Sequence, residues 1–281
     1  MSPKPIKQSI IAFKMNIKKP KNILITGASS GLGAALAEKY AEPGINLFLT
    51  ARNQERLEKI AQICRTKGAE VFLRALDICE QKSFADWVAV IETQNAIDLV
   101  FANAGISAGT SGKEPESATQ SQMIFSTNLF GVLNTIHAIL PYFYQRESGQ
   151  IALISSLAGF RGLPNCPSYS ASKAAVKAYG EGLRPLLKKS GINLSVITPG
   201  YIRTPMTDVN DFYMPCLIEA HQAAAYIKDQ LIKNPPLISF PFPFSLAVRI
   251  MAALPKCLID PILSHMPNKK PLSSESSLAS K

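Results

Sequence analysis

The feature that most constrains the fold is a regular alternation of short apolar segments with longer segments of helical pattern. The short segments are rich in β-branched residues and end at glycine or polar residues. Strands that alternate with helices of this length predict a doubly wound α/β fold, with a parallel sheet covered by helices on both faces. The predicted strands are residues 22–26, 45–50, 71–76, 97–102, 151–155 and 193–198, and the predicted helices are residues 30–42, 53–67, 82–93, 122–144 and 169–189.

The distribution of charge argues against a nucleic-acid partner. The chain has 281 residues and a net charge of +10, and six lysines with no acidic residue fall within residues 1–22. Most of the excess positive charge therefore belongs to one terminal arm. A solvated tail and an arm that contacts acidic lipid headgroups are the two interpretations of this arm.

A glycine-rich turn follows the first predicted strand. The run from Thr26 to Gly33 reads Thr-Gly-Ala-Ser-Ser-Gly-Leu-Gly, and a helix is predicted to begin within it. Glycines let the backbone approach a pyrophosphate closely, and a helix N-terminus offers unpaired N–H groups to it. The strand–turn–helix context therefore predicts a dinucleotide site. Its candidate residues are Gly27, Ser29, Ser30, Gly31, Leu32 and Gly33.

The end of the second predicted strand indicates which dinucleotide binds. A carboxylate there would accept hydrogen bonds from the ribose hydroxyls of NAD and would repel a 2′-phosphate. The sequence has Ala51 at this position, and Arg52 follows it. Because a guanidinium matches a phosphate in charge and geometry, the sequence predicts NADP(H), with Arg52 as the phosphate ligand.

Tyr169 and Lys173 form a candidate catalytic pair. Their four-residue spacing places them on one face of a helix. A free tyrosine has a pKa near ~10, and a neighbouring lysine cation is expected to lower that pKa. Tyr169 is therefore a candidate general acid/base. Because such a pair is common on helices, the prediction of a catalytic role depends on the dinucleotide motif in the same chain.

These motifs together resemble the short-chain dehydrogenases/reductases, whose signatures are Thr-Gly-x3-Gly-x-Gly and Tyr-x3-Lys. The resemblance spans residues 22–206 and includes Ser156, thirteen residues before Tyr169, and Asn128 in the run 126–131. It implies that Ser156 holds the substrate oxygen. If the strand continues through this pair, the neighbouring Ser155 points the other way. The resemblance also implies that Asn128 anchors a water beside Lys173.

The resemblance assigns further residues to the cofactor. An acid after the third strand resembles the adenine contact, and Asn-Ala-Gly after the fourth strand supports the cofactor floor. Lys173 would bind the nicotinamide ribose, and a Pro-Gly motif follows the sixth strand. The cofactor candidates added in this way are Asp77, Ile78, Asn103, Ala104, Gly105, Tyr169, Lys173, Pro199, Gly200, Ile202 and Thr204.

The resemblance implies a Rossmann-type, NADP(H)-dependent oxidoreductase acting on a small-molecule carbonyl or secondary alcohol. It also implies a homodimer or homotetramer, built partly from the helices predicted over residues 122–144 and 169–189. No His/Cys cluster has metal-ligand spacing, so no metal site is predicted. The alternative is a non-catalytic NADP(H)-binding regulatory protein. An epimerase/dehydratase acting on nucleotide sugars is disfavoured, because that branch usually has different glycine spacing and a larger substrate domain.

The predicted domain organisation has four parts. Residues 1–20 form a basic flexible arm, residues 21–210 the Rossmann-type catalytic domain, residues 211–267 a substrate lid with an apolar helical segment, and residues 268–281 a disordered tail. The apolar helices are expected to pack on the domain or a partner subunit, to lie in a membrane interface, or to wall a substrate channel. An apolar lid favours a hydrophobic or lipid-like substrate.

The cysteines and the hydropathy pattern predict a cytoplasmic protein. The five cysteines are scattered with no Cys-x2-Cys pair, which is typical of reduced thiols. No run reaches the ~18 uncharged apolar residues typical of a spanning helix. A peripheral membrane contact stays open as an addition to this assignment.

Overall fold

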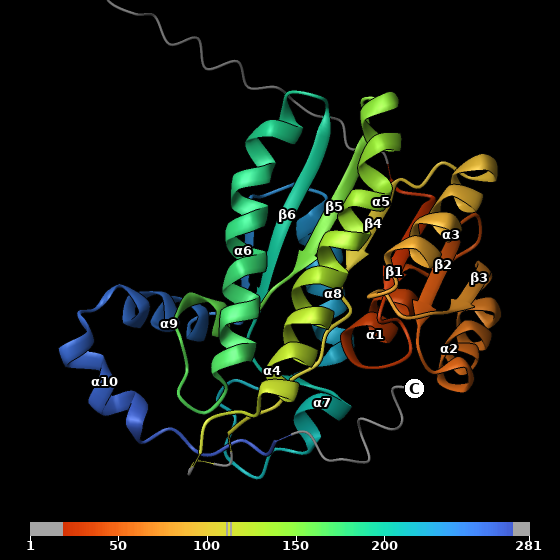
Figure 1. Ribbon diagram of the computed structural model, residues 1–281. Coiled ribbons are helices and arrows are strands. Elements are labelled where there is room, and N and C mark those ends of the chain that lie inside the picture. The colour runs from red at the N-terminus through yellow and green to blue at the C-terminus, as the bar shows by residue number, and fades with distance from the viewer. Residues whose placement is uncertain (1–18, 111, 113, 272–281) are drawn as a thin grey trace, which may run out of the picture.

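The predicted doubly wound sheet is present in the structure, a computed structural model that describes residues 19–110, 112 and 114–271. Seven parallel strands pair in the order β3-β2-β1-β4-β5-β6-β9 (Figure 1). Helices cover both faces of this sheet, as the alternation in the sequence predicted. The strands are β1 (Asn22–Thr26), β2 (Asn46–Ala51), β3 (Glu70–Ala75), β4 (Leu99–Ala102), β5 (Gly149–Ile154), β6 (Ile192–Pro199) and β9 (Leu237–Phe240).

The alternation of side chains along each strand divides the interior into two cores. In β1, Ile23 and Ile25 join the core on one face, whereas Leu24 joins the core on the other. All three side chains are fully buried, which explains why this strand is apolar without interruption.

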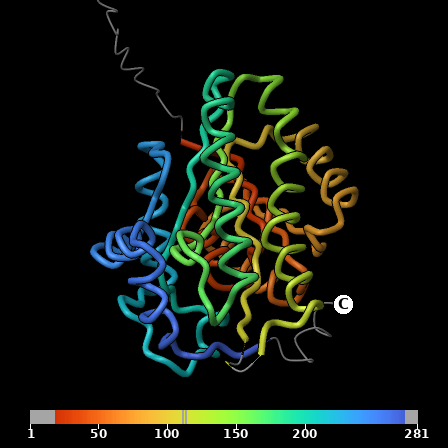
Figure 2. Tube along the Cα trace, turned by 60° about the vertical axis from the view of Figure 1, so that its left-hand side comes forward, coloured from red at the N-terminus to blue at the C-terminus, as the bar shows by residue number. Residues whose placement is uncertain are grey.

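The two cores are closed by two sets of helices (Figures 1 and 2). The first core packs against α1 (Gly31–Tyr40), α2 (Gln54–Thr66) and α8 (Ala220–Leu231). The second packs against α3 (Gln81–Gln94), α5 (Gly131–Gln145) and α6 (Pro167–Lys188).

Strand order reverses between β1 and β4, and this places the ligand site. The chain runs outward from β1 to β3 and then returns to β4 on the other side of β1. In such sheets a crevice forms beyond the carboxyl ends of the strands at the reversal. The loops after β1 and β4 therefore face each other across this crevice.

The helix predicted over residues 122–144 is longer and irregular. Helical backbone runs from α4 (Ala118–Phe125) through a π-helical turn, η1 (Ser126–Phe130), into α5. Among the described residues, this run is also the one helix long and apolar enough to cross a membrane by length and composition. The hydropathy argument overlooked it because polar side chains interrupt its apolar residues. Its apolar side packs in the second core.

Residues 211–267 divide between the sheet and its periphery. Helix α8 and strand β9 complete the main sandwich, although the sequence pattern weakens there. The apolar helices α9 (Phe244–Ala253) and α10 (Lys256–Ser264) lie beside the sandwich (Figure 1). Short elements between β6 and α8 are β7 (Ile202–Arg203), α7 (Pro205–Asp208) and β8 (Ile218–Glu219).

Most of the two predicted terminal tails lies outside the described residues. Only residues 19–20 of the predicted arm and residues 268–271 of the predicted tail are described. We expected residues 268–271 to be disordered, but they pack against other loops. The backbone N–H of Gly109 donates to the carbonyl of Lys270 over 2.8 Å.

Candidate functional site

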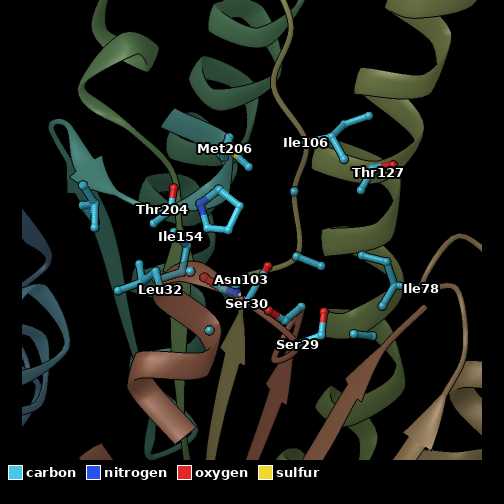
Figure 3. A pocket seen from close by; sticks show the side chains of 18 of the residues that line it. Ser29, Ser30, Leu32, Ile78, Asn103, Ile106, Thr127, Ile154, Thr204 and Met206 are labelled. Atoms are coloured by element: carbon cyan, nitrogen blue, oxygen red, sulfur yellow. Dashed lines mark hydrogen bonds between the residues drawn. The ribbon is translucent and has the colours of Figure 1, made fainter. Parts of the chain in front are cut away.

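A cleft of about 550 Å³ opens at the carboxyl ends of the strands, where the reversal of strand order predicts it. Figure 3 shows Ser29, Ser30 and Asn103 at its floor, with Thr204 and Ile106 on opposite walls. Every candidate residue from the sequence lines this cleft except Asn128, which is buried behind it. The lining candidates are Gly27, Ser29, Ser30, Gly31, Leu32, Gly33, Arg52, Asp77, Ile78, Asn103, Ala104, Gly105, Ser156, Tyr169, Lys173, Pro199, Gly200, Ile202 and Thr204.

The glycine turn has room only for backbone. Gly27 has a φ of +68°, and a Cβ there would lie 2.7 Å from the Cα of Ala104. A Cβ on Gly33 would lie 2.2 Å from the carbonyl oxygen of Gly27. The Ser30 side chain makes no capping hydrogen bond to α1, so the first-turn N–H groups of this helix are left for an anion. These features suit a pyrophosphate.

Asn103 and Thr26 join the two loops beneath the cleft. The Asn103 amide donates to the carbonyl oxygens of Thr26 over 2.9 Å and Gly27 over 3.3 Å. The Thr26 hydroxyl oxygen accepts from the backbone N–H groups of Asn103 and Ala104. The Asn-Ala-Gly run therefore ties β1 to β4, the supporting position that the resemblance implies.

The far end of the cleft is cationic. Ala51, Arg52 and Arg56 line it, and the Arg56 N–H donates to the Asn53 side chain that caps α2. Sequence reasoning missed Arg56, although an arginine one turn into the helix after β2 was a readable signal. Asp77 lies at the same end and accepts from the Cys79 N–H over 2.9 Å.

Burial governs the titration of Tyr169. Desolvation raises the pKa of its hydroxyl to about 12, and a side-chain hydrogen bond with Ser156 opposes this increase in pKa. We expected Lys173 to lower the pKa of Tyr169 below that of free tyrosine. In the protein without a bound cofactor the pKa of Tyr169 is raised instead, because desolvation has a larger effect than the hydrogen bond that opposes it. Ser155 points away, and its hydroxyl donates to the Lys173 carbonyl over 2.7 Å.

Lys173 is a buried cation beside the tyrosine. Its Nζ lies 5.9 Å from the centroid of the Tyr169 ring and donates to the Ile154 carbonyl over 3.0 Å. Its side chain is only 4% exposed, and desolvation lowers the pKa of its ammonium to about 8. The group therefore exchanges its proton much nearer neutral pH than an ordinary lysine does.

The π-helical turn positions Asn128. Its Oδ1 accepts from the Ile106 N–H over 2.7 Å, and its Nδ2 donates to the Ile106 carbonyl and the Ser172 hydroxyl. A methyl group added at Gly105 would lie 3.2 Å from Asn128 Oδ1 and 3.3 Å from Lys173 Nζ. Gly105 thus keeps a small polar space between these two side chains.

Several lining residues escaped the sequence analysis. Ile106 and Thr127 line one wall, Ile154 lies at the end of β5, and Met206 lies on the opposite wall (Figure 3). Ile106 and Ile154 lie at or just after strand ends, which was a signal in the sequence, whereas Thr127 belongs to the π-helical turn and Met206 to α7. Ala51 and Ser155, which the sequence analysis named without assigning them to the site, also line the cleft. The lining residues that it did not name are Asn53, Arg56, Leu76, Ile106, Thr127, Ile154, Pro205, Met206 and Thr207.

Tyr201, a neighbour of Tyr169, belongs to a cluster of aromatic side chains. The Tyr201 ring stacks on Phe244, with centroids 6.2 Å apart, and meets the edge of Phe212 at 6.4 Å. Tyr201 and the buried Cys166 both act electrostatically on the hydroxyl of Tyr169 and raise its pKa. The catalytic candidates therefore have an apolar neighbour contributed by α9 and by the loop before β8.

Comparisons with known proteins identify relatives of this architecture. Residues 21–211 match the family model described as short chain dehydrogenase. A Myxococcus xanthus protein described as an uncharacterized oxidoreductase is 33% identical over 242 residues, which cover 85% of this chain and 95% of that protein.

Solved structures resemble the fold with different nucleotides bound. A Burkholderia cenocepacia short chain dehydrogenase in complex with NADP has a TM-score of 0.75 and 25% identity, covering 90% of this chain and 100% of that one. A Mycobacterium paratuberculosis short chain dehydrogenase bound to NAD has a TM-score of 0.72 and 21% identity, covering 80% and 98%. Cofactor preference therefore has to be argued from the residues of this chain.

Proposed function

Because this chain belongs to the short-chain dehydrogenase/reductase family, we propose that it is an NADP(H)-dependent oxidoreductase acting on carbonyl groups or secondary alcohols. The observation that carries the proposal is the convergence of Ser156, Tyr169 and Lys173 at one end of the dinucleotide cleft. A bound nicotinamide cofactor supplies or accepts the hydride, and the protein supplies position and proton transfer.

The residues of the cleft fit a phosphorylated dinucleotide. The glycine turn and the first turn of α1 would hold the pyrophosphate, since a Cβ at Gly27 or Gly33 would collide with backbone. Ala51 leaves the ribose end without the carboxylate that repels a 2′-phosphate, while Arg52 and Arg56 bring two guanidinium groups to it. These features support NADP(H) over NAD(H).

The side chains divide the chemistry among them. Ser156 would hold the substrate oxygen beside the Tyr169 hydroxyl, with which it already shares a hydrogen bond. Tyr169 would give its proton to that oxygen in reduction and take it back in oxidation. Lys173 would bind the nicotinamide ribose and stabilise the phenolate, and the polar space at Gly105 would let Asn128 relay the proton.

The apolar neighbourhood supports a hydrophobic substrate. Tyr201 acts electrostatically on Tyr169 and forms an aromatic cluster with Phe212 and Phe244. The loop before β8 and helix α9, which carry Phe212 and Phe244, would then act as the lid over the substrate. A non-catalytic NADP(H)-binding role is the alternative, and the placement of all four catalytic candidates around one end of the cleft disfavours it.

We also propose that α9 and α10 touch a lipid surface. Leu246 and Ile250 are exposed apolar side chains on α9, and Leu258 and Ile262 are exposed apolar side chains on α10. Exposed apolar side chains on two neighbouring helices suit insertion at a membrane interface. Anionic vesicles should bind the wild-type protein and fail to bind a Leu258→Glu variant; if neither protein binds, the lipid contact is excluded.

A homodimer or homotetramer is proposed through η1 and α6. Phe130 and Leu186 are large apolar side chains on these elements, and both are more than half exposed. Light scattering after gel filtration should show an oligomer for the wild type and a smaller species for Leu186→Glu.

Nucleotide titration tests the proposed function most directly. NADPH and NADH binding, followed by fluorescence, should show tight NADPH binding in the wild type and weaker binding in Arg52→Ala and Arg56→Ala. Loss of a hydrogen bond to a charged group predicts about 10- to 100-fold weaker binding for a direct ligand. Arg249→Ala, an exposed arginine on α9, is the matched control.

The outcomes separate cofactor choice from enzymatic activity. Equal affinity for NADH and NADPH, or no effect of either arginine substitution, would refute NADP(H) preference. A carbonyl screen with Tyr169→Phe then tests catalysis: turnover that survives this change would refute the role of Tyr169, and an absence of any turnover with bound NADPH would favour the non-catalytic alternative.

A further inference from the structure

The C-terminal segment 267–270 crosses the substrate side of the site and is attached to three separate loops. Pro267 accepts from the Asn165 side chain over 2.8 Å, and the Lys270 carbonyl accepts from Gly109 over 2.8 Å. The Lys270 ammonium pairs with Asp211 at 3.2 Å. The segment therefore follows the edge of the molecule where the strands end (Figure 1).

Gly109 shows that the receiving loop is shaped for this segment. A Cβ at Gly109 would lie 2.4 Å from both the Cβ and the carbonyl oxygen of Lys269, and 2.7 Å from the carbonyl oxygen of Asn165. Any side chain at this position would displace the segment, since two of the three atoms belong to backbone. The close approach of the two segments brings Lys269 next to Tyr169.

Lys269 directs its ammonium toward the catalytic tyrosine. Its Nζ lies 5.2 Å from the centroid of the Tyr169 ring and donates to the Ser107 hydroxyl. Desolvation lowers the pKa of this ammonium, and the ionisable side chain that acts on it electrostatically is Cys166. In the part of the chain that the structure describes, no carboxylate pairs with Lys269, in contrast to its neighbour Lys270.

A partly buried cation without a carboxylate partner is costly, and an anionic ligand would offset that cost. We propose that Lys269 binds the carboxylate of the substrate, so that the enzyme acts on short oxo acids or the matching hydroxy acids with an apolar body. This inference rests on the proposed function, because it places the reacting carbonyl at Tyr169 and Ser156.

The distances limit where the carboxylate lies in the substrate. A charge-assisted hydrogen bond spans about 2.8 Å, and the ammonium is 5.2 Å from the centroid of the ring that carries the catalytic hydroxyl. One small molecule can reach both groups only if its carboxylate is a few bonds from its carbonyl. The aromatic rings of Tyr201 and Phe244 would receive the apolar remainder.

The experiment compares benzoylformate with its methyl ester, which keeps the phenyl group and the oxo group but lacks the negative charge. Binding to the enzyme–NADP⁺ complex by calorimetry and NADPH-dependent kcat/KM are measured for both compounds. The wild type should prefer the acid, and Lys269→Gln should lower the acid-to-ester ratio about 10- to 100-fold. Lys269→Arg should retain most of the preference.

Lys270→Gln is the matched control, because Lys270 is adjacent in sequence but pairs with Asp211. It should leave the acid-to-ester ratio unchanged. An acid that binds no better than the ester in the wild type, or an unchanged ratio in Lys269→Gln, would overturn the proposal. Equal loss of kcat for both compounds would show that Lys269 acts on Tyr169 alone, and a gain with both would show that the segment obstructs the site; either result overturns carboxylate recognition.

The failure of this inference is distinguishable from the failure of the proposed function. Wild-type NADPH binding and Tyr169-dependent reduction of neutral carbonyls report the proposed function without reference to charge on the substrate. If both persist while the acid and the ester are treated alike, only the role of Lys269 is refuted.

Discussion

Replacing Lys173 with methionine should stabilise the protein at neutral pH while abolishing its activity. Burial lowers the pKa of Lys173 from 10.5 to about 8. At 1.36 kcal/mol per pKa unit, holding the proton at pH 7 costs the folded state about 3 kcal/mol. Methionine removes this cost but leaves the Ile154 carbonyl without its donor, which returns about 1 kcal/mol. The free energy of unfolding should rise by about 2 kcal/mol.

The same pKa shift predicts how stability depends on pH. Because the folded-state pKa of Lys173 is below its unfolded value, the unfolded chain binds more protons between about pH 8 and pH 10.5. The cost is fully present below pH 8, and it disappears as the pH rises toward 10.5. Wild-type stability should therefore gain up to about 3 kcal/mol over this interval relative to Lys173→Met.

Urea unfolding followed by circular dichroism at several pH values between 7 and 10.5 measures both effects. Lys177→Met is the control, since Lys177 lies one turn further along α6 and its ion pair with Glu181 at 2.8 Å is partly exposed. It should change stability little at any pH. A Lys173→Met variant that is less stable than wild type at pH 7, or that shows the wild-type pH dependence, would refute the reasoning.

Three further predictions concern the cleft, the periphery and the thiols. Gly33→Ala places a methyl group 2.2 Å from a backbone carbonyl, so NADPH titration should show weaker binding and thermal melting a loss of about 1–3 kcal/mol; wild-type affinity would contradict the close packing of the turn. Arg146→Leu leaves the Glu92 carboxylate, whose side chain is only 4% exposed, without its 2.6 Å partner, and urea unfolding should show a loss of about 3 kcal/mol, whereas a neutral result would mean that solvent reaches Glu92. Burial raises the pKa of Cys166 to about 11, so iodoacetamide at pH 8 should label the exposed Cys257 and spare Cys166 in peptide mass spectra; equal labelling would show that the site opens readily.

Local sequence patterns predicted several boundaries and site residues correctly or to within two residues. Strand β1 begins and ends at the predicted residues 22 and 26. An uninterrupted apolar run that is followed by glycines is typical of a strand buried on both faces of a sheet. Helix α6 begins at Pro167, two residues before the predicted start, because proline suits the first turn of a helix. The spacing from Ser156 to Tyr169 also led directly to side chains that line one cleft.

Other features depended on neighbours that are distant in sequence. Strand β9 has only four residues in a proline-rich region, and pairing with β6 makes it a strand. The pKa of Tyr169 follows from burial, which spacing within a helix does not reveal. Lys269 lies 100 residues after Tyr169 and was assigned to a tail, yet loop contacts bring it over the Tyr169 ring.

The sequence by itself determined the fold class, the family and the predicted catalytic and cofactor residues, because these depend on periodicity and on spacing within single strand–turn–helix units. Only the tertiary structure decided the seventh strand, the second arginine that lines the cleft and the cation beside Tyr169. These features depend on contacts between loops and strands that are distant in sequence. Such contacts determine the burial and the electrostatic surroundings of a side chain, and no local sequence pattern encodes them.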